Sequence, residues 1–109
     1  MKYKLQPFKV PADCRIIKND FTTYDPEKEF DEDFSLNSLT EDLLQLEFKN
    51  KDIVVDLGWY GDSGKNQGTF KIYVIKGSDW ENQIKVHESK HQKIITQQLE
   101  LILKEMSLK

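Results

Sequence analysis

Two runs of alternating apolar residues, joined by a glycine-rich loop, constrain the fold of this chain more than any other feature. Residues 53–60 place every second side chain on one apolar face, and residues 69–76 repeat the same period of two. β-branched and aromatic residues dominate both runs, as a half-buried strand favours. Gly61, Gly64 and Gly68 lie between the runs, where glycine accommodates the backbone of a tight turn. The pattern therefore predicts an antiparallel hairpin with one buried face.

Further strands are predicted on both sides of this hairpin. Residues 43–49 also alternate, and the turn at residues 50–52 leads back into the hairpin. A short strand is expected at residues 84–88, after a turn at residues 79–82. Pro7 confines any opening strand within residues 3–10 to an edge of the sheet. These segments predict one antiparallel sheet of about four to six strands with a central meander.

The C-terminal part of the chain has the period of an amphipathic helix. Its apolar stripe consists of Ile95, Leu99, Ile102 and Met106. Ser89 and Gln92 have the spacing of a capping box, which places the predicted helix start near Lys90. A separate helical turn is expected to begin at Ser38. With the stripe covering one face of the sheet, residues 1–109 form a single α+β domain of two layers.

The composition is ordinary for a globular chain and excludes several classes of protein. Charged residues make up 32% and hydrophobic residues 38%. No apolar run approaches the roughly 20 residues that a membrane span needs, and the first ten residues lack the apolar core of a secretory signal. The single cysteine, Cys14, cannot form an intramolecular disulfide, and we expect a half-buried side chain there instead of a reactive thiol. We therefore expect a cytoplasmic location and no membrane partner.

Negative charge is concentrated in one segment. Carboxylates crowd residues 25–33 and continue at Glu41 and Asp42, with Lys28 as the only cation among them. Such a block repels phosphate, which argues against nucleic acid as a partner, and attracts a basic protein more strongly at low salt. Phe30 and Phe34 would pin the segment to the body of the protein. A solvated loop that serves solubility explains the same charges at least as well.

The sequence HESKH at residues 87–91 matches the zinc-peptidase pattern H-E-x-x-H. In that motif both histidines lie on one face of a helix. Because the capping box would start the helix after Glu88, His87 is expected outside it, and the chain has no third histidine. We therefore predict no metal site here, and two surface histidines explain the match.

Two other catalytic patterns also fail. Gly64 and Lys65 match only the end of the phosphate-binding loop pattern, and a strand follows where that motif needs a helix. Cys14 with either histidine is the one pairing available for nucleophilic catalysis, and no local feature supports it. Trp59, Tyr60, Tyr73 and Trp80 could stack bases but are better explained as core and interface residues. The sequence thus predicts no catalytic, cofactor-binding or metal site.

The chain resembles a family of small bacterial immunity proteins from contact-dependent growth inhibition and related polymorphic toxin systems. The resemblance covers roughly residues 44–106 and centres on a Gly-Trp-Tyr strand end and an Asp-Trp-Glu-Asn turn. The motif residues are Gly58, Trp59, Tyr60, Asp79, Trp80, Glu81 and Asn82. Gly61 and Gln83 stand where the family often has proline. Both departures affect the rigidity of turns more than chemistry.

The resemblance implies a protein that is not an enzyme, needs no cofactor, and neutralises a cognate toxin domain by stoichiometric binding. Many such toxins are basic nucleases, which an acidic inhibitor attracts. The candidate toxin-binding residues are Asp25, Glu27, Glu29, Phe30, Asp31, Glu32, Asp33, Phe34 and Asp62. We expect charge reversal at residues 31–33 to weaken binding and leave the thermal midpoint nearly unchanged. If the Trp80 ring is buried, Trp80→Ala should cost about 3 kcal/mol or more.

The sequence also allows other binding surfaces and other functions. The toxin could instead contact a face of the sheet or the loop at residues 61–68. The chain could be a small metal-dependent enzyme that uses His87 and His91. It could also be a general adaptor that binds a protein by strand addition at an exposed sheet edge. The sequence leaves the oligomeric state open as well.

Overall fold

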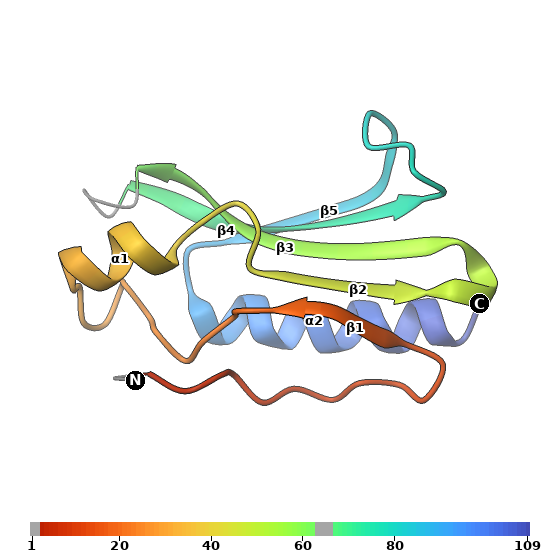
Figure 1. Ribbon diagram of the computed structural model, residues 1–109, viewed down its shortest axis with the longest axis horizontal. Coiled ribbons are helices and arrows are strands. Elements are labelled where there is room, and N and C mark those ends of the chain that lie inside the picture. The colour runs from red at the N-terminus through yellow and green to blue at the C-terminus, as the bar shows by residue number, and fades with distance from the viewer. Residues whose placement is uncertain (1–2, 63–66) are drawn as a thin grey trace.

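The computed structural model describes residues 3–62 and 67–109, which form a five-stranded antiparallel sheet with two α-helices (Figure 1). The strands follow one another in space in chain order, so the sheet is a meander. The α+β fold with a C-terminal helix on one sheet is therefore confirmed. The elements are β1 (Arg15–Asn19), α1 (Glu32–Ser38), β2 (Leu44–Phe48), a 3-10 turn (Lys49–Lys51), β3 (Ile53–Asp62), β4 (Gln67–Lys76), β5 (Gln83–Ser89) and α2 (Gln92–Ser107).

The buried face of the sheet follows the predicted period of two. β3 and β4 pair along their whole length, which sets Leu57 opposite Ile72 and Trp59 opposite Phe70. β2 continues the same face, because Leu44 lies opposite Leu57. All these side chains are buried in one apolar cluster. A shift of one residue in this register would turn every one of them to the other face, so burial determines the register.

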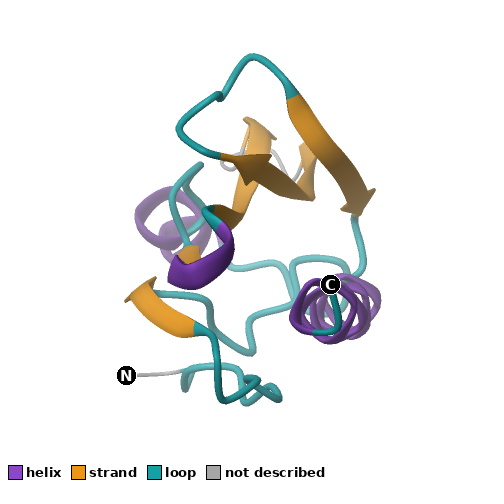
Figure 2. Ribbon diagram, turned by 90° about the vertical axis from the view of Figure 1, so that its right-hand side faces the viewer, coloured by secondary structure: helices purple, strands orange, loops and turns teal. Residues whose placement is uncertain are grey.

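Helix α2 covers this face, and Figure 2 shows it end-on beneath the strands. Its apolar stripe is buried in the cluster as predicted. Gln92 at its start donates hydrogen bonds to Gln6 Oε1 and to the Thr22 carbonyl, both at 2.9 Å. At its end, Lys51 Nζ donates to the carbonyls of Met106 and Ser107 at 2.8 and 2.6 Å. A lysine satisfies the unpaired last carbonyls of a helix in this way.

The predicted capping box at the start of α2 is wrong. Ser89 is the last residue of β5, where it lies opposite Phe70. Its Oγ accepts a hydrogen bond from the His91 backbone N–H at 3.0 Å, and His91 is the N-cap of the helix. The helix therefore begins at Gln92 instead of near Lys90, because strand pairing holds the preceding residues in the sheet.

The predictions for the first forty residues need two further corrections. The strand expected within residues 3–10 is reduced to one bridge, between Leu5 and Thr22, and the edge strand is β1. The helical turn expected to begin at Ser38 instead ends there. Helix α1 begins earlier because the Asp31 side chain accepts a hydrogen bond from the Phe34 N–H at 3.1 Å and caps the helix. Within the described residues, no helix has the length and apolar character to cross a membrane.

Candidate functional site

The acidic arm, which we define as residues 25–38, is fixed to the body of the protein by a buried hydroxyl pair. The Tyr24 hydroxyl lies 2.5 Å from Ser35 Oγ, and both side chains are buried. The same hydroxyl accepts a hydrogen bond from the Asp31 N–H at 2.9 Å. One tyrosine thus holds both the N-cap and the first half of α1. The arm is a folded element and not a solvated loop.

An aromatic cluster ties the arm to the N-terminal segment. The rings of Tyr3, Tyr24 and Phe34 contact one another pairwise, with centroid distances of 4.6 to 5.0 Å and tilted or edge-to-face geometry. Pro26 is buried at the start of the arm. The predicted role of Phe34 as an apolar anchor therefore acts within the protein, since the ring packs against its own chain.

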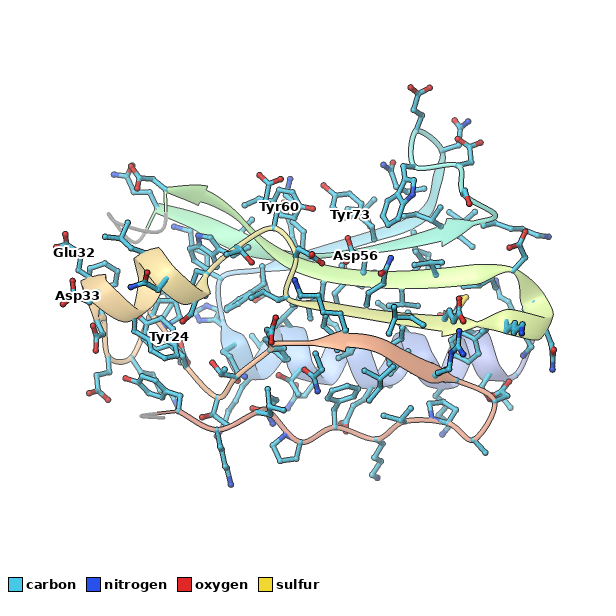
Figure 3. All side chains as sticks on the ribbon, in the orientation of Figure 1. Tyr24, Glu32, Asp33, Asp56, Tyr60 and Tyr73 are labelled. Atoms are coloured by element: carbon cyan, nitrogen blue, oxygen red, sulfur yellow. The ribbon has the colours of Figure 1, made fainter. Side chains whose placement is uncertain are left out.

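The structure divides the predicted toxin-binding residues into two groups. Asp25, Asp31 and Phe34 are half-buried, and the first two accept local backbone hydrogen bonds, from Glu27 and Phe34 respectively. The members of the predicted set that are exposed on the arm are Glu27, Glu29, Phe30, Glu32 and Asp33, and Lys28, Leu36 and Asn37 are exposed beside them. Figure 3 shows Glu32 and Asp33 at the end of the molecule, directed away from the sheet. The exposed group therefore forms an acidic surface around one exposed phenyl ring.

Asp62 lies at the end of β3, opposite Gln67. Its side chain is exposed. Most of the glycine loop that follows, including Gly64 and Lys65, lies outside the described residues. β4 begins directly after that gap, so a strand follows the loop as predicted.

A second surface lies on the face of the sheet opposite α2, which we call the open face. One row of aligned residues crosses all five strands there: Lys18, Gln45, Asp56, Tyr73 and Val86. The ring of Tyr60 meets that of Tyr73 at 5.6 Å in an edge-to-face contact. Figure 3 shows Asp56, Tyr60 and Tyr73 together on this side of the sheet. Strand register has thus assembled a carboxylate and two phenols.

The chain itself borders the open face on two sides. Residues 40–42 cross over β3 at Gly58, where the Glu41 backbone leaves no room for a side chain. The turn between β4 and β5 rises above the sheet at the other end (Figure 1). Ile75 is fully buried on this side, yet it does not belong to the core cluster. The open face is therefore shaped by its borders and is not a flat strand surface.

Among the carboxyl groups of the described residues, Asp56 has the largest shift in pKa. Partial burial, with a smaller contribution from Asp42, raises its pKa to about 6, while Lys18 lowers it. Burial and the charge of Asp56 in turn raise the pKa of Tyr60 to about 12. No hydrogen bond contributes to the pKa of Asp56. The open face thus holds a half-buried carboxylate whose charge is poorly compensated.

The residues of the Gly-Trp-Tyr and Asp-Trp-Glu-Asn elements have different environments. Trp59 is buried in the core, Tyr60 lies half-buried on the open face, and Trp80 is 46% exposed. The turn closes through its own hydrogen bonds, from Asn82 Nδ2 to Asp79 Oδ2 at 2.9 Å and from Gln83 Nε2 to the Trp80 carbonyl at 2.6 Å. Glu81 is exposed. The turn therefore does not need the Trp80 ring in the core.

The H-E-x-x-H match is divided between two elements. His87 lies in β5 opposite Ile72 and is half-buried, whereas His91 is the exposed N-cap of α2. The motif therefore does not present both imidazoles from one helix, as zinc peptidases require. Among the residues that the structure describes, no group of three or more histidine, cysteine, aspartate and glutamate side chains is placed to hold a metal ion.

Cys14 has the environment of an unreactive thiol. Burial raises its pKa to about 11, and the neighbouring charges of Asp13 and Glu47 act in the same direction. The thiolate, which is the nucleophilic form, is therefore scarce at neutral pH. The half-buried position agrees with the expectation from the sequence.

Asp56 lies outside the predicted set of site residues, although one signal for it is visible in the sequence. A carboxylate within a run of β-branched residues lowers stability when it is partly buried without a partner. Its presence on the face opposite the core therefore suggests that this face has a function. The alignment of Asp56 with Tyr73 depends on strand register, which the sequence alone does not provide. Comparison of the chain with family models, with curated proteins and with solved structures finds no match.

Proposed function

We propose that this chain is an immunity protein that resides in the cytoplasm, binds a cognate toxin domain one to one and performs no reaction itself. The toxin would be a basic domain, of which a nuclease is the leading case. The observation that carries the proposal is the acidic arm, because its exposed carboxylates stand on a backbone that is already ordered. The family resemblance of residues 44–106 supports the same conclusion.

The rigidity of the arm favours tight binding. An ordered loop loses little conformational entropy when a partner binds, so more of the contact energy appears as affinity. The buried contact of Tyr24 with Ser35 supplies that order before any partner arrives. A segment of the same composition without these anchors would have to be ordered by the partner.

The chemistry of the arm suits a basic partner. Its carboxylates accelerate encounter with a positively charged protein and can pair with lysine and arginine side chains. Phe30 is 42% exposed among these charges and provides an apolar anchor of the kind found at the centre of interfaces. Nuclease active sites are basic because they bind phosphate, so an acidic surface competes for the same groups.

The test is co-expression with the toxin domain encoded immediately upstream, followed by calorimetry on the purified pair. We expect a one-to-one complex whose affinity falls as the salt concentration rises. Replacement of Glu27, Glu32 and Asp33 by lysine should weaken binding by at least about a hundredfold if the arm is the contact surface. This variant keeps Asp31, because that residue caps α1.

A matched control uses one charge reversal on each side of the molecule. Asp33→Lys should weaken binding, whereas Glu105→Lys, on α2, should leave the affinity within about twofold. Equal effects of the two variants would move the interface away from the arm. Failure of the wild-type protein to bind the toxin, or turnover of a substrate by the isolated protein, would overturn the proposed function.

A further inference from the structure

The open face of the sheet has an unbalanced charge that favours a cationic occupant. Each cation that the structure describes on this face already has an acidic partner: Arg15 pairs with Glu47, Lys18 with Asp42 at 2.8 Å, and Lys71 with Glu88 at 3.8 Å. Among the described residues, Asp56 and Glu41 have no such ion pair. The Glu41 backbone passes over Gly58 on this face, and the Glu41 charge acts on the Tyr60 hydroxyl. The face therefore retains negative charge after its internal pairs are formed.

The aromatic rings on this face provide a second attraction for a cation. Tyr73 lies directly across the strands from Asp56, and its ring contacts that of Tyr60. Lys71 Nζ already lies over the Tyr60 ring, 5.6 Å from its centroid. This contact within the chain shows that a positive group packs on these rings. A guanidinium can stack on a ring and also donate two parallel hydrogen bonds to one carboxylate, a planar geometry that an ammonium lacks.

An apolar strip lies next to the rings. Val86, opposite Tyr73, is 49% exposed, and Ile84 and Trp80 are exposed to a similar degree. Exposed apolar side chains that gather beside a charged group mark protein interfaces more often than single exposed residues do.

We propose that the open face is a docking surface for a protein partner that places an arginine side chain against Asp56 and Tyr73. Apolar side chains beside that arginine would pack on Val86 and Trp80. The carboxylates without an ion pair on this face are complementary in charge to an arginine side chain. The acidic arm is a separate surface, so this inference does not depend on the proposed function.

A second copy of this chain fits the open face poorly. A two-fold dimer through this face would bring the same unpaired carboxylates near one another, and like charges at an interface are unfavourable. Nucleic acid fits poorly for the same reason, because phosphate would meet Asp56 and Glu41. A basic protein surface is the class of partner that remains consistent with these charges.

The test titrates isotopically labelled protein with N-acetyl-arginine amide and follows backbone amide resonances. The matched probe is N-acetyl-citrulline amide, which has nearly the same shape without the charge. We expect saturable shifts at residues 56, 60 and 73 with the arginine probe and much smaller shifts with citrulline. Asp56→Asn should weaken binding of the arginine probe about tenfold, while the control Glu105→Gln, on α2, should not alter it.

Several outcomes of this titration would contradict the inference. Equal shifts from the two probes, shifts confined to other surfaces, or unchanged affinity in Asp56→Asn would overturn the inference. A dimer that forms with increasing protein concentration and protects residues 56, 60 and 73 would assign the open face to a second copy and also overturn it. Because the buried charge at Asp56 opposes folding, we expect the asparagine variant to fold.

Discussion

The backbone of Glu41 crosses the sheet directly over Gly58, so a Cβ atom on Gly58 would lie 2.2 Å from the Glu41 carbonyl oxygen. Hydrogen bonds hold the crossing on both sides, from Trp59 N–H to the Thr40 carbonyl at 2.7 Å and from Leu43 N–H to the Leu57 carbonyl at 3.1 Å. This contact joins α1 to the sheet and places Glu41 and Asp42 beside the open face. The glycine of the Gly-Trp-Tyr element therefore has a packing role.

Gly58→Ala should be one of the most damaging small substitutions in the chain. The new methyl group meets backbone atoms, which cannot move aside as a flexible side chain can, so we expect a loss of roughly 2–3 kcal/mol in the free energy of unfolding. Gly77→Ala is a useful comparison, because its Cβ would be 3.4 Å from the nearest atom and its cost comes from a φ of 66°. Urea unfolding should rank Gly58→Ala as the more destabilising of the two.

Asp56→Asn should stabilise the protein at neutral pH. The pKa of Asp56 is raised to about 6 by burial, so the folded state prefers the protonated form. The contribution of Asp56 to the free energy of unfolding is therefore most favourable below pH 4 and is lost as the pH rises through 6. A shift of that size corresponds to about 3 kcal/mol for a fully buried group, and solvent screening at this partly exposed carboxyl reduces it to about 1 kcal/mol.

Urea unfolding of both proteins between pH 3 and pH 8 tests this expectation. The two curves of stability should coincide near pH 3 and separate between pH 4 and pH 6, with the variant above. Glu105→Gln gives the opposite sign, because a hydrogen bond from Lys85 lowers the pKa of Glu105 and contributes stability at neutral pH that acid removes. An Asp56→Asn variant that is less stable than wild type at pH 7 would contradict the described environment.

Trp80→Ala should have little effect on stability, which corrects the estimate for a buried ring. The side chain is 46% exposed and the turn is closed by hydrogen bonds of its neighbours. We expect a change of about 1 kcal/mol or less. Trp59→Ala, which removes a ring that is 2% exposed, should cost about 3–5 kcal/mol. Thermal unfolding of both variants gives this comparison directly.

Tyr24→Phe should loosen the acidic arm. The substitution keeps the aromatic cluster but removes the hydroxyl that contacts Ser35 Oγ and accepts from the Asp31 N–H, at a cost of roughly 1–3 kcal/mol. Hydrogen exchange at residues 32–38 should accelerate more than exchange in β3 and β4. Equal acceleration in the arm and the sheet would show that Tyr24 supports the whole domain instead of the arm.

Charge reversal at residues 31–33 should not leave the thermal midpoint unchanged, because one of the three residues is structural. Asp31 caps α1, and its replacement by alanine should cost about 1 kcal/mol. Glu32→Ala removes an exposed carboxylate in the first turn and should cost less than about 0.5 kcal/mol. A thermal midpoint that is lowered equally by both variants would argue against the cap.

Much of the fold was accessible from local pattern. The alternation in residues 53–60 and 69–76 depends on neighbouring residues alone, and it predicts both the strands and their buried face. The stripe from Ile95 to Met106 predicts α2 in the same way. The start of α2 is the exception, because Ser89 is held in β5 by its pairing with Phe70 and cannot serve as a cap.

The composition of the open face and the exposure of Trp80 depend on contacts between segments that are distant in the sequence. Asp56 and Tyr73 become neighbours through strand register, and the Glu41 backbone lies on the same face because Gly58 leaves room for it. Whether Trp80 is buried depends on what covers its turn, which no local pattern records. Periodicity belongs to consecutive residues and can be read from the sequence. Burial, pairing and charge compensation belong to residues brought together by folding, so the tertiary structure alone decided them.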